Sequence, residues 1–143
     1  MLYVDTSVLV ALCTHETKTD DVLQWYAACT EELACAAWGV TEFASALGIK
    51  QRTGQLTALQ AKSAWVQFER ICANDLQLLP VEAKCFHQAA MMTMDATAAL
   101  RAGDALHLAC ALEANAQGMV TLDAVLAKNA ERFKLKTVAI KSR

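Results

Sequence analysis

Two short apolar segments, each leading through an acid into a helix, constrain the fold of this chain most. Residues 2–4 (Leu-Tyr-Val) precede Asp5, and residues 119–122 (Met-Val-Thr-Leu) precede Asp123. The first segment lacks the polar alternation of a half-exposed strand, which is typical of strands covered on both faces of a parallel sheet. Ligands of open α/β sheets bind beyond the carboxyl ends of the strands, and Asp5 is expected to lie there.

Strand-like and helix-like segments alternate along the rest of the chain. Apolar residues at helical spacing predict helices over residues 8–13, 20–30, 40–52, 56–73, 82–94 and 102–112, and a short helix that follows Asp123 and ends at Asn129. Strands are predicted over residues 2–4, 32–36, 76–81, 119–122 and 137–140, with Pro80 at a strand end or edge and a frayed tail over residues 141–143. Gly39 is interpreted as the start of a strand-to-helix passage, and Gly118 as the residue that stops the helix before it. This alternation predicts an α/β fold with a parallel central sheet and helices on both of its faces.

The composition is that of a compact globular chain. Hydrophobic residues make up 55% and charged residues 20% of the 143 residues, which predicts one domain over residues 1–143 with a sizeable core. Six cysteines show no CxxC pair and are expected to be buried free thiols. The chain has no basic leader and no apolar run near the roughly 20 residues that cross a bilayer, so a soluble cytoplasmic protein is expected.

The charge balance limits how this chain can bind nucleic acid. A formal charge of −2 and a pI of about 5.9 exclude binding through overall positive charge, so a nucleic-acid partner requires a local patch or a metal ion. Scattered cations on the predicted helices 40–52 and 56–73 are interpreted as solvated surface charges. These cations are Lys50, Arg52, Lys62 and Arg70.

Four acids stand at the transitions between predicted elements. Asp5 and Asp123 follow strands, whereas Glu42 and Asp104 fall at the beginnings of helices. On its own, an acid that caps a helix contributes about 1 kcal/mol, and one near a helix N-terminus about 0.3 to 1 kcal/mol. Like charges about 4 Å apart repel by roughly 4 kcal/mol at an effective dielectric constant near 20, so convergence of the four requires a cation or raised pKa values. Carboxylates without a thiolate or clustered imidazoles suit Mg²⁺ or Mn²⁺.

Such a site suits the hydrolysis of phosphodiesters. A divalent ion joins phosphate to acidic walls, helix N-termini favour phosphate, and a carboxylate that the ion does not fully engage can orient the attacking water as a general base. Ser7 is expected either to brace Asp5 or to cap its helix, and Thr121 either to hydrogen-bond the site or to be an ordinary strand residue. His107, three residues beyond Asp104, is interpreted as a satisfied core residue. No nucleophile elbow, Cys–His motif or glycine-rich phosphate loop indicates another chemistry.

Four segments together resemble the PIN-domain ribonucleases, most closely the VapC-type toxins of bacterial toxin–antitoxin pairs. They are residues 3–9 (YVDTSVL), 41–47 (TEFASAL), 103–109 (GDALHLA) and 120–123 (VTLD), which together span essentially the whole chain. The resemblance implies a three-layer α/β/α sandwich, Mg²⁺-dependent endonuclease cleavage of single-stranded RNA, a homodimer and an inhibitory antitoxin protein as partner. It also implies that Asp5 and Asp104 are the principal metal ligands, and that Glu42 and Asp123 are ligands through water or supply the base.

Two other classes of function stay open at the level of the sequence. A PIN-like fold without catalysis would serve as an RNA-binding or protein-interaction module, although the presence of all four acids favours the nuclease. A phosphoryl-receiver domain is also a small α/β protein with an acidic Mg²⁺ pocket. It requires two adjacent acids after the first strand, where this chain has Asp5 followed by Thr6. The low pI leaves the RNA substrate unassigned.

Overall fold

The protein is built on a parallel sheet of five strands in the order β3-β2-β1-β4-β5. The structure, a computed structural model, describes residues 1–141. All four neighbouring pairs of strands run parallel, which confirms the α/β fold with a central parallel sheet. The strands are β1 (Leu2–Val4), β2 (Leu33–Ala36), β3 (Leu76–Leu79), β4 (Gly118–Val120) and β5 (Lys136–Val138).

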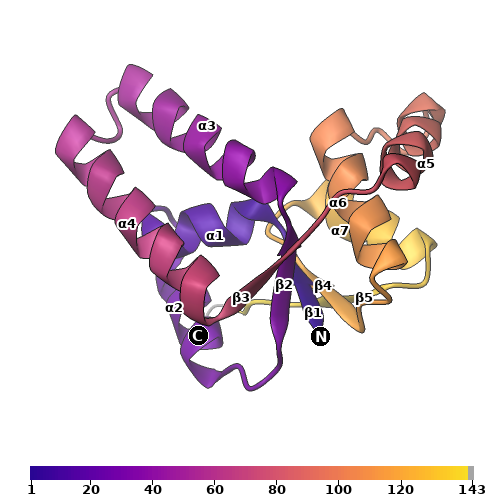
Figure 1. The fold of residues 1–143 in the computed structure, drawn as a ribbon, viewed down its shortest axis with the longest axis horizontal. Helices are drawn as coiled ribbons and strands as arrows, with labels where there is room; N and C mark the ends of the chain where they lie inside the picture. Colours follow the sequence, from indigo (N-terminus) through magenta and orange to yellow (C-terminus); the bar gives the residue numbers. More distant parts are fainter. Residues whose placement is uncertain (142–143) are drawn as a thin grey trace.

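Seven helices of the described chain cover the two faces of this sheet. They are α1 (Thr6–Cys13), α2 (Thr19–Ala28), α3 (Trp38–Arg52), α4 (Ala58–Asn74), α5 (Ala83–Met94), α6 (Ala102–Glu113) and α7 (Ala124–Arg132). Helices α1 to α4 lie on one side of the sheet and α5 to α7 on the other (Figure 1). The three layers expected from the resemblance are therefore present.

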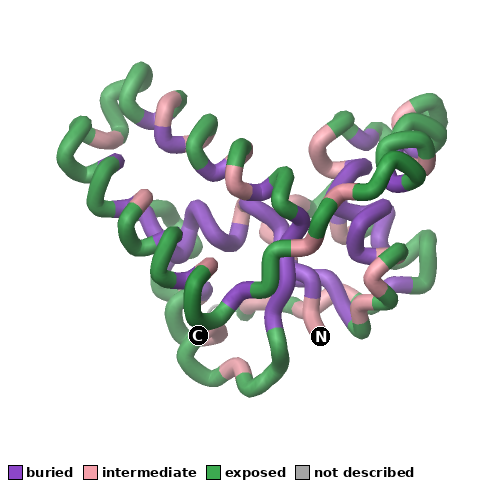
Figure 2. Tube along the Cα trace, viewed as in Figure 1, coloured by how far each residue is buried: buried purple, intermediate pink, exposed green. Residues whose placement is uncertain are grey.

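The core lies on both faces of the central strands. Tyr3 and Val4 of β1 are almost completely buried, because β1 is flanked by β2 and β4 and covered by helices on both sides. Residues 105–111 of α6 are all buried, as expected for a helix that is apolar almost all round (Figure 2). On the other face, Phe43 of α3 stacks on Phe68 of α4 with ring centroids 4.1 Å apart, which holds the two long helices together.

Helix α3 begins earlier than the sequence predicts. Residue 40 was the expected first residue, whereas the helix begins at Trp38 and includes Gly39. Glycine there is needed for packing and does not mark a boundary, because a Cβ at this position would lie 2.6 Å from Sγ of Cys35. As a consequence, the prediction that Glu42 lies in the first turn is wrong, and stabilisation by the helix dipole does not explain this acid.

The segment between α6 and β4 also differs from the prediction. Gly118 was expected to stop the helix, but it is the first residue of β4. Helix α6 ends at Glu113, and Asn115 takes the left-handed conformation, with φ 54°, that ends many helices. Because β4 ends at Val120, Thr121 lies just beyond the strand and not within it.

Several smaller features complete the comparison with the sequence. A capping box of Thr57 and Gln60 starts α4 at Ala58, two residues later than predicted. Pro80 directly follows the edge strand β3, as predicted. All six cysteines are free and four of them are buried. Within residues 1–141, no helix is long and apolar enough to cross a membrane. The predicted frayed tail falls largely on residues 142 and 143, which lie outside the described residues.

The close approach of α3 to β2 gives a test of the fold. We expect Gly39→Ala to lower the free energy of unfolding by about 1 to 3 kcal/mol, because the new methyl group would overlap the buried sulfur of Cys35. In a Cys35→Ala background the same change should cost much less, because the sulfur is gone. Urea denaturation of the four proteins measures both effects. An equal loss in the two backgrounds would contradict this account of Gly39.

Candidate active site

The sheet topology brings two of the four acids to the same edge. Strands β1 and β4 are parallel neighbours, with Val4 opposite Val120. Asp5 and Asp123 therefore both follow the carboxyl ends of adjacent central strands. The backbone amide of Asp5 donates to the carbonyl of Val120 across 3.1 Å, which holds the two segments together beyond the last paired residues.

Asp5 is held by hydroxyl groups and does not cap its helix. It occupies the N-cap position of α1, but its side chain makes no capping hydrogen bond. Its carboxylate accepts from Oγ of Ser7 at Oδ1 across 2.5 Å and from Oγ1 of Thr121 at Oδ2 across 2.7 Å. Burial raises the pKa of Asp5, and these hydroxyl donors, together with the charge of His107, oppose that rise. Asp5 is thus not a simple helix cap.

Asp123 does cap a helix and also belongs to the same hydrogen-bonded corner. Its Oδ1 accepts from the backbone amide of Leu126 across 2.9 Å, at the start of α7. The amide of Asp123 donates to Oγ1 of Thr121 across 3.0 Å, and the amide of Leu122 donates to Oγ of Ser7 across 3.1 Å. Ser7 and Thr121 therefore link the two acids, since each hydroxyl accepts from the segment of Asp123 and donates to Asp5.

Glu42 is fixed by a buried network that the sequence does not predict. Its Oε1 accepts from Oγ1 of Thr6 across 2.8 Å and is also hydrogen-bonded to Nε2 of His107. The other ring nitrogen of His107, Nδ1, lies 2.6 Å from the hydroxyl of Tyr3, and that hydroxyl accepts from the amide of Ala36 across 3.0 Å. The network thus connects β1, β2, α1, α3 and α6.

The hydrogen bonds make Nε2 of His107 a donor. The Thr6 hydroxyl has one proton and donates it to Glu42, so its oxygen, 3.1 Å from Nε2 of His107, can only accept from that ring. The other ring nitrogen, Nδ1, pairs with the hydroxyl of Tyr3. Both ring nitrogens of His107 thus have partners. His107 is therefore a satisfied buried residue, as interpreted, but its partner is one of the four acids.

The environment of Glu42 favours its ionised form. Burial alone would raise the pKa of Glu42, but the hydrogen bond and charge of His107, with further hydrogen bonds from Thr6 and Trp38, lower it below its usual value. The carboxylate also lies against the first turn of α6. A Cβ built on Gly103 would lie 2.8 Å from Oε2 of Glu42, so glycine leaves the space that this carboxylate occupies.

The pKa of Asp104 is affected by the charges of the other three acids. Burial raises the pKa of Asp104 from 3.8 to about 6, and the charges of Asp123, Asp5 and Glu42 add to this rise, against an opposing effect of His107. The other three acids are thus near enough to affect the pKa of Asp104, although they are far from it in the sequence. Negative charge therefore accumulates at one end of the sheet. The sequence predicts that such an accumulation requires a cation or the protonation of an acid.

The donor set suits a hard divalent cation. Across residues 1–141, no group of three or more His, Cys, Asp or Glu side chains is arranged to hold a metal ion as it stands. Mg²⁺ does not need such a cage, because it keeps several waters and is commonly held by one or two carboxylates and by phosphate groups of the substrate. Glu42 and Asp123 line a cleft of about 410 Å³, together with Ser7, whose hydroxyl binds Asp5. The residues present therefore fit Mg²⁺ or Mn²⁺.

Four residues of the network were missed by sequence reasoning or given another role. They are Tyr3, Thr6, Trp38 and His107. A buried tyrosine hydroxyl normally has a partner, so Tyr3 within an apolar strand was a usable indication of a nearby polar group. The i, i+3 spacing of Asp104 and His107 was the other indication. Neither one identifies Glu42 as the partner, because that contact joins residues from different helices.

Comparisons with known proteins agree on the fold. The family model for the PIN domain matches residues 2–132. The chain is structurally similar to VapC20 of Mycobacterium tuberculosis, described as a toxin that cleaves the sarcin–ricin loop, with a TM-score of 0.72 and 16% identity over 90% of this chain and 95% of that one. It is also similar to FitAcB of Neisseria gonorrhoeae, with a TM-score of 0.67 and 18% identity over 97% of both chains. A toxin–antitoxin complex of Klebsiella pneumoniae matches with a TM-score of 0.65 and 14% identity over 100% of both chains. No curated protein sequence matches the chain.

The raised pKa of Asp104 predicts how pH changes the stability of the metal-free protein. Between about pH 4 and 6 the unfolded chain ionises Asp104 while the folded chain keeps it protonated, so folding loses stability as the pH rises through this window. Above about pH 6 the full penalty is present. We therefore expect Asp104→Asn to raise the melting temperature in EDTA at pH 7, and this gain to vanish near pH 4, as measured by thermal denaturation.

A matched control has the opposite sign. Hydrogen bonds from Thr97 lower the pKa of the exposed Asp95, so Asp95→Asn should lower the melting temperature at pH 7, and its effect should shrink as the pH falls through the lowered pKa. A gain for Asp104→Asn of the same size at pH 4 and pH 7 would show that ionisation is not its cause.

Proposed function

This chain belongs to the PIN domain family, and on that premise we propose that it is a metal-dependent endoribonuclease that cleaves single-stranded RNA as the toxin of a toxin–antitoxin pair. The observation that carries this proposal is the electrostatic coupling of the four acids at the carboxyl end of the sheet. Similarity to VapC20, whose description names a cleaving toxin, supports the same function.

Each acid has a role in this proposal that its contacts support. Asp5 and Asp104 would be the principal ligands of Mg²⁺, with Mn²⁺ as an alternative ion. Ser7 and Thr121 each engage one oxygen of Asp5, which orients the carboxylate and still leaves lone pairs for an ion. When bound, the ion would offset the negative charge of the phosphate and the acids. It would also lower the pKa of a water molecule, which attacks more readily once it has lost a proton.

Glu42 and Asp123 would act at longer range, as ligands through water or as the base. Asp123 has one oxygen committed to capping α7, which leaves the other for a water. Glu42 is held ionised by its network, and an ionised carboxylate is required to accept the proton of an attacking water. His107 positions Glu42 and does not itself need to touch the substrate.

The partners are proposed on the same grounds. A similar structure is described as a toxin–antitoxin complex, which supports an inhibitory antitoxin protein as partner. The homodimer expected from the resemblance stays a prediction, and the exposed Met91 and Met94 of α5 offer apolar surface for such a contact. A cytoplasmic location likewise stays a prediction. A PIN-like module that binds RNA without cleaving it is the alternative.

Dependence on metal and on the acids tests the function directly. We expect the protein to cleave single-stranded RNA in Mg²⁺ and to lose this activity in EDTA. Asp5→Asn and Asp104→Asn should each lower the rate of cleavage by at least about 10³-fold, because each removes a ligand and a charge from the site. Gel analysis of end-labelled RNA measures the rates, and circular dichroism checks that the variants are folded.

Asp20→Asn, an exposed acid in α2, is the matched control and should cleave as the wild type does. RNA that is bound but not cut by the wild type in Mg²⁺ and in Mn²⁺ would favour the silent module. Cleavage that persists in both aspartate variants would reject the proposed site.

Gly103→Ala tests the position of Glu42 without removing an acid. The new methyl group would lie 2.8 Å from Oε2 of Glu42, so the end of that side chain must move. Displacement of a group in a reactive site by about 1 Å can cost about 10²-fold in rate, and we expect a loss of that order in RNA cleavage. Strain on the network of Glu42 opposes the roughly 0.5 to 1 kcal/mol by which alanine is favoured over glycine within a helix, so we expect the variant to stay folded.

Gly48→Ala provides the control for this variant. Gly48 also lies within a helix, and a Cβ there would meet only the end of Arg52, at 3.3 Å. The variant should therefore keep the wild-type rate of cleavage. If Gly103→Ala is folded and cleaves RNA at the wild-type rate, the placement of Glu42 does not limit the reaction.

A further inference from the structure

A second hollow adjoins the acidic cleft and differs from it in charge. It has a volume of about 660 Å³, within the range of roughly 300 to 1,000 Å³ of small-ligand pockets. Glu16 and Leu122 line both hollows, so the two are continuous. Leu122 directly precedes Asp123, which places the second hollow beside one of the four acids.

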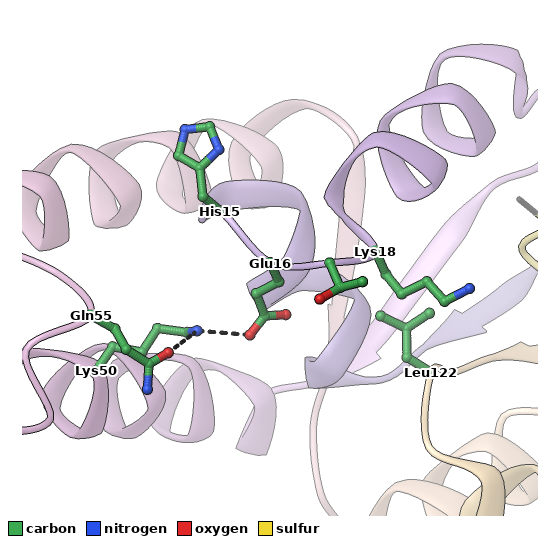
Figure 3. A pocket seen from close by; sticks show the side chains of 7 residues that line it. His15, Glu16, Lys18, Lys50, Gln55 and Leu122 are labelled. Atoms are coloured by element: carbon green, nitrogen blue, oxygen red, sulfur yellow. Dashed lines mark hydrogen bonds and ion pairs between the residues drawn. The ribbon is translucent and has the colours of Figure 1, made fainter.

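This second hollow, called here the lysine pocket, carries two cations. Lys50 reaches it from the last turn of α3, and Lys18 from the residue before α2 (Figure 3). In that view Glu16 lies between the two lysines. Lys50 pairs with Glu16, and Lys18 pairs with Asp21 across 3.7 Å. The adjoining cleft is lined instead by the acids Glu16, Glu42 and Asp123.

Lys50 was interpreted from the sequence as a solvated surface cation, and this interpretation is wrong. Only 11% of its side chain is exposed, and its Nζ is 2.8 Å from a carboxylate oxygen of Glu16 and 3.3 Å from Oε1 of Gln55. An ion pair that is partly buried, with 33% of the Glu16 side chain exposed, adds little net stability because desolvation and solvent screening offset the attraction. A gain in the stability of the fold therefore does not explain why Lys50 is buried.

The wall that carries Glu16 is held in place by hydrogen bonds. Oγ1 of the buried Thr19 accepts from the amide of Glu16 across 2.8 Å, and lies 2.7 Å and 2.9 Å from the carbonyl oxygens of Ala11 and Thr14, to which it donates. The loop between α1 and α2 is thereby tied to both helices. A pocket with fixed walls loses little conformational entropy when a ligand binds.

We propose that the lysine pocket binds one nucleotide next to the scissile bond of the RNA, with Lys50 and Lys18 contacting its phosphate. This inference rests on the proposed ribonuclease function and adds the positive contact that an acidic protein needs to hold RNA. A phosphate in the pocket must compete with the carboxylate of Glu16 for Lys50. Glu16 therefore lowers the affinity of the pocket for RNA.

The salt dependence of RNA binding tests the proposal. Fluorescence anisotropy of a labelled single-stranded RNA is measured in Mg²⁺ with Asp104→Asn, which prevents cleavage, over about 50 to 200 mM salt. Adding Lys50→Gln or Lys18→Gln should weaken binding about tenfold each and reduce the slope of log K against log salt by about 0.7, the value for one phosphate contact on a single strand. Adding Glu16→Gln should strengthen binding several-fold.

A control variant separates charge in the pocket from general effects. Lys84→Gln removes a lysine that is also paired with a glutamate, Glu113, but lies on α5 outside the pocket, so affinity and slope should not change. Because Lys50 is buried, loss of Lys50 could disturb the fold. The Lys18→Gln variant avoids this problem, because 47% of the Lys18 side chain is exposed and its loss should not disturb the fold.

The outcomes distinguish the pocket from the function on which it rests. Unchanged affinity and slope in the Lys18 and Lys50 variants, while the wild type cleaves RNA, would overturn the pocket and leave the nuclease intact. Weaker binding by Glu16→Gln would also overturn it, because the pocket would then need the carboxylate. Wild-type protein that neither binds nor cleaves RNA would overturn both proposals.

Discussion

Mutual repulsion among four carboxylates is the constraint on which the arrangement of this protein depends. The acids meet because parallel strands deliver their carboxyl ends to one edge of the sheet, while α3 and α6 bring two more from the side. Repulsion between like charges at close range exceeds what a single helix cap can offset. Burial is the largest cause of the raised pKa of Asp104, and the charges of the other three acids add to it. The cluster of acids therefore lowers the stability of the fold at the proposed active site.

The chain manages this cost by surrounding the acids with donors. Hydroxyl groups hold Asp5, a backbone amide holds Asp123, and the ring of His107 holds Glu42. These contacts also give the acids different characters, since the pKa of Glu42 is lowered whereas that of Asp104 is raised. Four residues of the same type can thereby take different parts in one reaction. Paired charges also occur in the lysine pocket, where the carboxylate of Glu16 binds Lys50.

Much of the fold could be predicted because its causes are local. Apolar strands without alternation, such as residues 2–4, indicate burial on both faces, and helical spacing identified every helix to within a few residues. The wrong predictions concern residues whose role depends on contacts with distant parts of the chain. Gly39 and Gly118 were both interpreted as boundaries, yet one permits a close approach to Cys35 and the other begins a strand.

The sequence by itself determined the fold class, the four acids as candidates and the hydroxyl groups of Ser7 and Thr121 near the first of them. The tertiary structure alone decided that Glu42 is bound to His107, 65 positions away, and that Lys50 is buried beside Glu16. The physical reason is that pattern and propensity act over a few residues, whereas a side chain's partner, burial and pKa are set by whichever elements pack against it.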